Sequence, residues 1–241
     1  MNIRSCFRFS LQMMLAFVLG FPMAGFVAAD KENPPSFEIE QLVINGVPVC
    51  DFLGNVIGVT IPLKRAGRLF LLEATVDKVT GNFILDTGAS GLVLNKTYFR
   101  NAICVDDEEA GGVTGAIGQI CRTTVKHMQV AELVYRNISA DVIPLGHLEN
   151  RRGVKILGLF GMSLLKNLEF VVDFRNNELQ LFKLDKYGNR LGTNLPKVKY
   201  DLVQKIEEYR NVLFVKATVG GKILDFCLDT GAESNVLSID A

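Results

Sequence analysis

Tryptophan is absent from the 241 residues, histidine occurs twice and cysteine five times. His127 and His147 have no partner in the sequence, and the cysteines do not have the spacing of metal ligands, so no metal site is predicted. The formal net charge is zero, with 26 Lys and Arg against 26 Asp and Glu, and no basic tract is present. The composition therefore gives no sign of a nucleic-acid or anionic membrane partner.

Apolar residues make up 49% of the chain and glycine contributes 22 residues. The apolar residues come in short alternating runs between turn residues, which is typical of a mainly β protein with a real core.

The N-terminal 29 residues differ from the rest. Arg4 and Arg8 precede an apolar stretch over 9–27, and Val27-Ala28-Ala29 offers small residues for cleavage. This pattern predicts a secretory signal peptide, so the mature protein is expected to be exported, to a periplasm or the extracellular space. An uncleaved membrane anchor is the alternative, although Pro22 and several glycines make the stretch a poor spanning helix, and no stable membrane span is expected after cleavage.

Four cysteines remain after that cleavage, an even number in an oxidising compartment. Cys104 and Cys121 are close enough in sequence to close a short loop, but the sequence does not fix the connectivity. Cys227 lies in a strand, where a buried free thiol is expected.

One tetrapeptide occurs twice, as Asp86-Thr87-Gly88-Ala89 and as Asp229-Thr230-Gly231-Ala232. The offset is 229 − 86 = 143, and it holds without a gap over roughly 27 residues, which indicates an internal duplication. The predicted organisation is a signal peptide (1–29), N-terminal strands and a linker (30–57), a complete unit (58–184), a linker (185–196) and a truncated second unit (197–241).

The expected elements of the first unit follow from its turn residues and apolar runs. They are strands at 38–44 and 56–61, a hairpin of 69–76 and 82–85 with its turn at 77–81, a strand at 92–94, a short helix at 163–168, and a last hairpin of 170–174 with 178–182.

Each residue of the repeated motif has a physical role. Asp supplies a carboxylate, Thr can hydrogen-bond to an opposing loop, and Gly and Ala allow a tight turn and close approach. Two such loops brought together would place Asp86 and Asp229 within reach of each other, so that they share a proton and activate a water molecule.

On these motifs the chain resembles the retropepsin-like aspartic peptidases, over 58–184 in full and 197–241 in part. The resemblance implies a closed β-barrel of the acid protease fold, one complete lobe plus the start of a second, with no cofactor and no metal. It implies catalytic roles for Asp86 and Asp229. The implied supporting residues are Thr87, Gly88, Ala89, Ser90, Thr230, Gly231 and Ala232 in the two loops, Gly112, Val113, Thr114, Gly115 and Ala116 in a substrate-covering flap, and Ile156, Leu157 and Gly158 packed beneath the first loop.

Several functions and assemblies stay open at this point. The leading one is an aspartic endopeptidase acting on peptides or unfolded proteins; the alternatives are a non-catalytic peptide- or glycan-binding protein and, more distantly, a glycosidase. The chain is either a piece of a two-lobed peptidase, a homodimer that pairs two copies of Asp86, or a protein whose second unit is inactive.

Overall fold

The computed structural model describes residues 48, 50–104, 106–112, 115–192 and 200–237, with only the backbone described over 106–112 and 115–120. The predicted signal peptide and the predicted strand at 38–44 lie outside the described residues.

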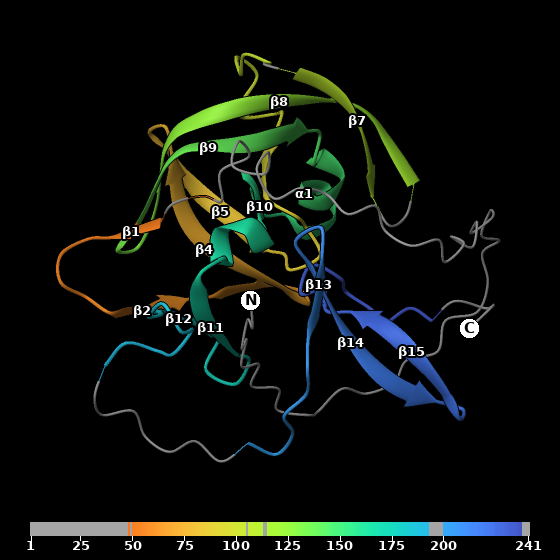
Figure 1. Cartoon of the computed structure of the whole chain (residues 1–241). Coiled ribbons are helices and arrows are strands. Elements are labelled where there is room, and N and C mark those ends of the chain that lie inside the picture. The colour runs from red at the N-terminus through yellow and green to blue at the C-terminus, as the bar shows by residue number, and fades with distance from the viewer. Residues whose placement is uncertain (1–47, 49, 105, 113–114, 193–199, 238–241) are drawn as a thin grey trace, which may run out of the picture.

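Six strands close into a mixed β-barrel, which occupies the upper part of the view in Figure 1. Two neighbouring pairs are parallel, β5 (Val79–Leu85) with β10 (Gly158–Phe160) and β6 (Leu92–Asn95) with β9 (Leu133–Ile143), and the other pairs are antiparallel. The closed barrel predicted from the sequence is confirmed. In order around the barrel its strands are β4 (Leu69–Val76), β5 (Val79–Leu85), β10 (Gly158–Phe160), β6 (Leu92–Asn95), β9 (Leu133–Ile143) and β8 (Gly115–Val130).

Smaller elements attach to this barrel. Three strands extend its sheet, namely β1 (Cys50–Phe52) on β9, β3 (Lys64–Ala66) on β4 and β7 (Asp106–Gly112) on β8. A second sheet contains β11 (Leu168–Asp173), β12 (Glu178–Lys183) and β2 (Gly58–Pro62).

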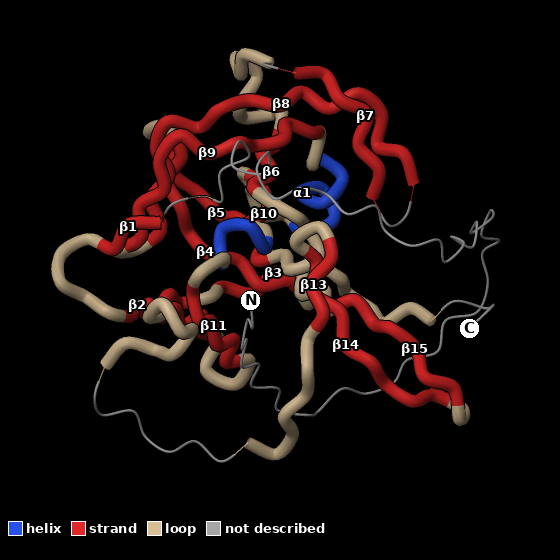
Figure 2. The backbone as a smooth tube through the Cα atoms, viewed as in Figure 1, coloured by secondary structure: helices blue, strands red, loops and turns tan. Residues whose placement is uncertain are grey.

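Helix is scarce, as the few blue segments of Figure 2 show. The described helices are α1 (Gly146–Arg152) and the 3-10 turn η2 (Met162–Leu165). Neither helix is long and apolar enough to cross a bilayer, and the described residues contain no other helix that is.

Two local predictions need correction, and one helix was missed. The turn expected at 77–81 is only Asp77-Lys78, because both residues adopt positive φ (43° and 78°) and form a two-residue hairpin turn that suits the twist of the strands. The helix expected at 163–168 is η2, which stops early because Asn167 has a φ of 61° and Leu168 already begins β11. Helix α1 had not been predicted.

A third sheet follows the linker, formed by β13 (Glu207–Tyr209), β14 (Val212–Val219) and β15 (Lys222–Cys227). Its strand pairing repeats that of β3, β4 and β5 at the offset of 143 seen in the sequence; for example, Phe214 pairs with Cys227 as Leu71 pairs with Ile84. Local strand pairing is therefore the same in both units.

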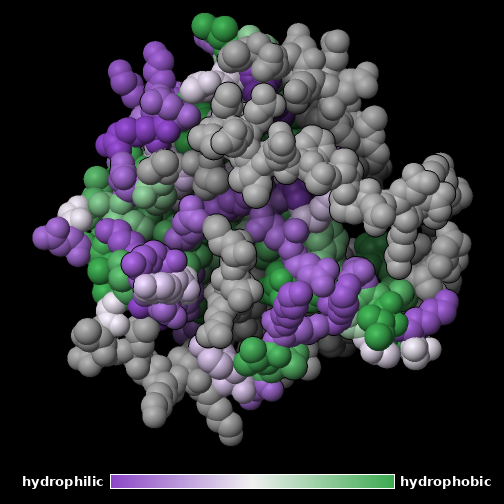
Figure 3. Space-filling view, viewed as in Figure 1, coloured by the Kyte–Doolittle hydropathy of each residue, from purple (hydrophilic) through white to green (hydrophobic). Residues whose placement is uncertain are grey.

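Burial, in contrast, differs greatly between the units. Of the described residues of the third sheet only Leu213 is buried, at the position equivalent to Phe70. Val219 is 41% exposed where its equivalent Val76 is fully buried. Apolar side chains accordingly reach the surface over the β14–β15 hairpin, seen at the lower right of Figure 3. The barrel is a closed core, and this sheet rests against it with its outer part uncovered.

Candidate active site

The two Asp-Thr-Gly loops meet face to face. Each follows the second strand of a hairpin, since Asp86 comes directly after β5 and Asp229 two residues after the end of β15. A Cβ atom added to Gly88 would lie 2.5 Å from Cγ of Asp229, and one added to Gly231 would lie 2.5 Å from Cγ of Asp86. Both motif glycines are therefore required by the approach of the opposing carboxyl group.

The two threonines join the loops by reciprocal hydrogen bonds. The Thr87 hydroxyl donates to the Leu228 carbonyl at 2.6 Å, and the Thr230 hydroxyl donates to the Leu85 carbonyl at 2.7 Å. Each hydroxyl also accepts from the opposing threonine's backbone N–H, at 3.0 and 3.1 Å. Thr87 is fully buried and Thr230 half-buried, so these four bonds lie partly out of water and hold the loops in one relative position.

Each aspartate is oriented by its own loop. Oδ1 of Asp86 accepts from the backbone N–H groups of Gly88 (2.9 Å) and Ala89 (3.1 Å). Oδ1 of Asp229 accepts from the corresponding groups of Gly231 and Ala232, at 2.8 and 3.0 Å. The two loops therefore orient their aspartates in the same way.

The environment of the pair is asymmetric. Asp86 is partly buried, whereas Asp229 is exposed. Burial, together with the charge of Asp229 and a hydrogen bond to it, raises the pKa of Asp86 from 3.8 to about 7, and the backbone N–H groups of Gly88 and Ala89 only partly oppose this. Ionising both of two adjacent carboxyl groups would place two negative charges side by side, which is unfavourable, so the pair keeps one proton at mildly acidic pH.

The segment containing Ile156, Leu157 and Gly158, predicted to pack beneath the first loop, leads into β10 next to that loop. β10 pairs with β5 and β6 on its two sides, and the Phe160 carbonyl accepts from the Asp86 N–H at 3.1 Å. Ile156 and Leu157 are buried in the core.

Further supporting residues follow this strand and were missed by sequence reasoning. The carbonyls of Ala89 and Ser90 accept from the N–H groups of Met162 (2.9 Å) and Ser163 (3.1 Å). Gly161 lies so close that an added Cβ would be 2.2 Å from the Gly91 carbonyl oxygen. Gly161 itself was the signal in the sequence that could have predicted this close approach of the two backbones.

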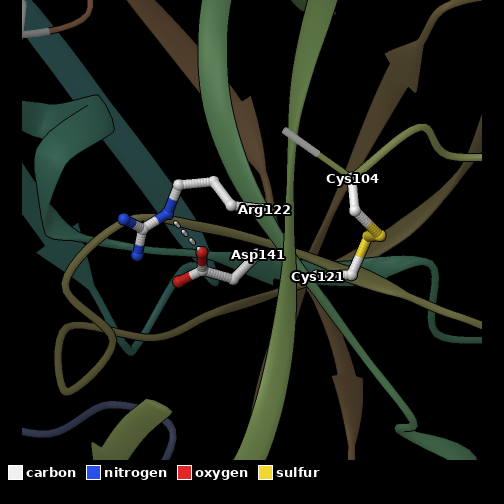
Figure 4. Close-up of a disulfide and its surroundings, with 4 residues drawn as sticks. All are labelled: Cys104, Cys121, Arg122 and Asp141. Carbon is white, nitrogen blue, oxygen red and sulfur yellow. Dashed lines mark hydrogen bonds and ion pairs between the residues drawn. A yellow bond between two sulfur atoms is a disulfide. The ribbon is translucent and has the colours of Figure 1, made fainter. Parts of the chain in front are cut away.

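The glycine-rich segment predicted as a flap forms the distal part of the β7–β8 hairpin. Gly112 pairs with Gly115 and Gly111 with Ala116, so the glycines continue the two strands, while Val113 and Thr114 lie outside the described residues. A disulfide joins Cys104, which precedes β7, to Cys121 on β8, next to the Arg122–Asp141 ion pair (Figure 4).

Other features of the described residues lie outside the loops. Cys50 and Cys227 are free and half-buried, and no cluster of His, Cys, Asp and Glu among the described residues has the arrangement of a metal site. A cavity of about 510 Å³ is lined by Val76, Asp77, Leu94, residues 97–103 and 123–125, none of which belongs to an Asp-Thr-Gly loop.

Comparison with known proteins agrees with this geometry. Residues 72–164, which include the first loop and β10, match the aspartyl protease family model. This part of the chain is therefore similar to aspartyl proteases. A retropepsin-like aspartic protease from Rickettsia conorii is among the similar solved structures, at 21% identity and a TM-score of 0.39, with 56% of this chain and 95% of that chain covered. No curated protein matches.

The matched residues end before the second loop, so Asp229 is placed by the geometry alone. The first unit supplies the closed barrel, the first loop and its support by β10 and η2. The third sheet supplies the opposing loop.

The threonine hydrogen bonds lead to a stability prediction. Thr87→Val removes the hydroxyl and leaves the Leu228 carbonyl and the Thr230 N–H without their partner, so the free energy of unfolding should fall by about 2 kcal/mol. Urea denaturation of the chain measures this change. Thr75→Val is the matched control, because the Thr75 hydroxyl meets that of Thr80 at an exposed site and its loss should cost about 0.5 kcal/mol or less. Equal midpoints for the two variants would contradict the role given to Thr87.

The raised pKa of Asp86 predicts how stability depends on pH. An unfolded Asp titrates near 3.8 and the folded Asp86 near 7, so between these values the folded protein holds a proton that the unfolded chain has lost. The contribution of Asp86 to stability is thus present below pH 4 and is lost as pH rises through 7. The lowered pKa values of Asp173 and Asp185 act below pH 4, outside this window.

Denaturation curves at pH 4 to 8 check this dependence. Asp86→Asn should flatten it and stabilise the chain relative to the parent at pH 8. Asp51→Asn, at an exposed carboxylate paired with Arg136, should follow the parent. A parent and an Asp86→Asn variant with parallel curves would show that Asp86 titrates normally.

Proposed function

We propose that the chain is an aspartic endopeptidase in which Asp86 and Asp229 are the catalytic pair. The observation that carries the proposal is the reciprocal docking of the two loops, with four threonine hydrogen bonds and each motif glycine against the opposing carboxyl group. The family of the first domain is one of peptidases, which agrees with this chemistry.

The asymmetry of the pair suggests which residue holds the proton. Asp86, whose pKa is raised to about 7, carries the shared proton at mildly acidic pH. The exposed Asp229 is assigned the role of general base. Asp229 takes a proton from a water molecule lying between the two groups, and the water oxygen attacks the peptide carbon. Asp86 donates its proton to the carbonyl oxygen, which gives a tetrahedral diol without a covalent enzyme intermediate.

Collapse of the diol breaks the C–N bond. The proton held by Asp229 passes to the departing amine, and Asp86 recovers one from the diol, so the pair returns to its starting state. The reaction written in this way uses no metal and no organic cofactor. Extended peptides or unfolded proteins are the expected substrates, bound by strand-like backbone pairing.

We further propose export. The N-terminal signal pattern supports it, and the Cys104–Cys121 disulfide is typical of an oxidising compartment such as a periplasm or the extracellular space.

A binding protein without catalysis is the second candidate, favoured by the exposure of Asp229 and by the uncovered third sheet. Proteolysis assays separate the two. The purified chain is incubated with an unfolded protein at pH 3 to 8, and fragments are identified by mass spectrometry. A peptidase cleaves internally below about pH 7, whereas intact substrate at every pH would reject the peptidase proposal and leave the binding protein.

A further inference from the structure

The residue after the second motif, Glu233, is held by the first unit. Its carboxylate forms an ion pair with Arg152 at the end of α1, and Arg151 lies 3.9 Å away. Its backbone carbonyl accepts from Nη1 of Arg68 at 2.9 Å. The equivalent residue of the first loop is the exposed Ser90, so only the second loop carries this attachment.

Arg152 is more deeply placed than an ordinary surface arginine. Its side chain is 11% exposed, against 74% for Arg151. Gly67 leaves room for it, since a Cβ added there would lie 2.6 Å from Nη1 of Arg152. Nε of Arg152 is buried and has no hydrogen-bond partner among the described residues, so Glu233 is the main compensation for the buried charge. An ion pair in this position is screened little by salt.

Helix α1 is in turn fixed to the support of the first loop. Oε1 of Glu149 accepts from the Ile156 N–H at 2.9 Å, and Oε2 accepts from Nδ2 of Asn95 at 3.2 Å. Nδ2 of Asn95 also donates to the Ile156 carbonyl at 2.9 Å. Ile156 leads directly into β10, which holds the Asp86 N–H. Arg152 therefore belongs to the same framework that positions Asp86.

We propose that Arg152 is a positioning residue for Asp229, and that it acts by holding Glu233 and thereby the second loop against the first. The expected effect of Arg152 on catalysis rests on the proposed function, in which Asp86 and Asp229 form the catalytic pair. The third sheet needs such an attachment because it contributes only Leu213 to the buried core. Apart from the contacts of Glu233, one more ion pair joins the second unit to the first among the described residues. It links Lys166 to Glu208 on β13 at 3.2 Å.

Arg152→Met tests the proposal, because it removes the charge while keeping most of the buried stem. We expect kcat to fall roughly 10- to 100-fold from misplacement of the second carboxylate, with KM changing less than about threefold. Arg151→Met is the matched control and should behave as the parent. The double variant Arg152→Met/Glu233→Gln, which leaves no unpaired buried charge, should fold and show the same loss as Arg152→Met.

A second readout does not require activity. Carboxyl NMR titration follows Asp86, which faces Asp229, with the Cys227 thiol also within electrostatic reach of the pair. If the second loop moves away in Arg152→Met, the pKa of Asp86 falls from about 7 toward 3.8. Loss of a nearby positive charge alone would instead raise it, so the direction separates positioning from a charge effect.

The outcomes are distinct. A fall in the pKa of Asp86 in both the single and the double variant supports the positioning role, even if the parent proves inactive as a peptidase and the proposed function fails. An unchanged or raised pKa in the folded double variant, with activity equal to that of Arg151→Met where activity exists, would overturn the inference.

Discussion

Asp86→Asn is expected to lower kcat for peptide hydrolysis at least roughly 1,000-fold, because the variant cannot deliver the shared proton at any pH. The oxygen of the new side-chain amide would still accept from the N–H groups of Gly88 and Ala89, so the loop should stay in place. Asp229→Asn should cause a similar loss if the two units of one chain form the pair. Proteolysis of an unfolded substrate at pH 3 to 7 measures both.

The comparison of the two variants also decides the assembly. Loss in both would agree with the intramolecular pair, whereas loss in Asp86→Asn alone would point to a homodimer that joins two copies of the first unit. Asp225→Asn is the matched control, since this carboxylate lies on β15 and pairs with Lys216 on the outer part of the sheet. Its activity should equal that of the parent. Full activity in Asp86→Asn would remove the residue from the mechanism.

Gly158→Ala is expected to destabilise the barrel by roughly 3 kcal/mol or more. The added Cβ would lie 2.0 Å from the backbone oxygen of Val93 and 2.7 Å from the ring of Phe83. Relief would require β10 to move, but β5 and β6 hold it on both sides. Because β10 also supports the first loop, activity should be lost together with the fold.

Thermal and denaturant unfolding check this effect. Gly146→Ala is the control, because nothing lies within 4 Å of its added Cβ, and alanine favours the helix that begins there. It should unfold at or above the midpoint of the parent. Matching midpoints for Gly158→Ala and Gly146→Ala would show that β10 tolerates a side chain.

The sequence predicted the parts of the site that lie within the repeat. The two loops, the hairpins before them and the segment 156–158 could be located because each has its own local signal. It was less informative about the contacts between the units. Helix α1 has seven residues and no side-chain N-cap, so the sequence contained no pattern that predicted it. The pairing of Arg152 with Glu233, across 81 positions (233 − 152), depends on where this helix lies.

Burial was also beyond the reach of the sequence. The repeat makes Val76 and Val219 equivalent, yet one is buried and the other exposed, because burial depends on strands from elsewhere in the chain. The same reason explains why Asp86 and Asp229, which share the motif Asp-Thr-Gly-Ala, differ in their exposure to water.

The weak burial of the β13–β15 sheet has a consequence for dynamics. Elements with few buried contacts open at a lower free energy than the global unfolding of a protein, and they do so as units. The sheet, attached through Leu213, the threonines and two ion-paired regions, should open while the barrel stays folded, and its amides should then exchange with solvent faster than those of β4 and β5. Each such opening would separate the two aspartates. The fraction of molecules able to react at a given moment would then be set by this local equilibrium rather than by the stability of the barrel.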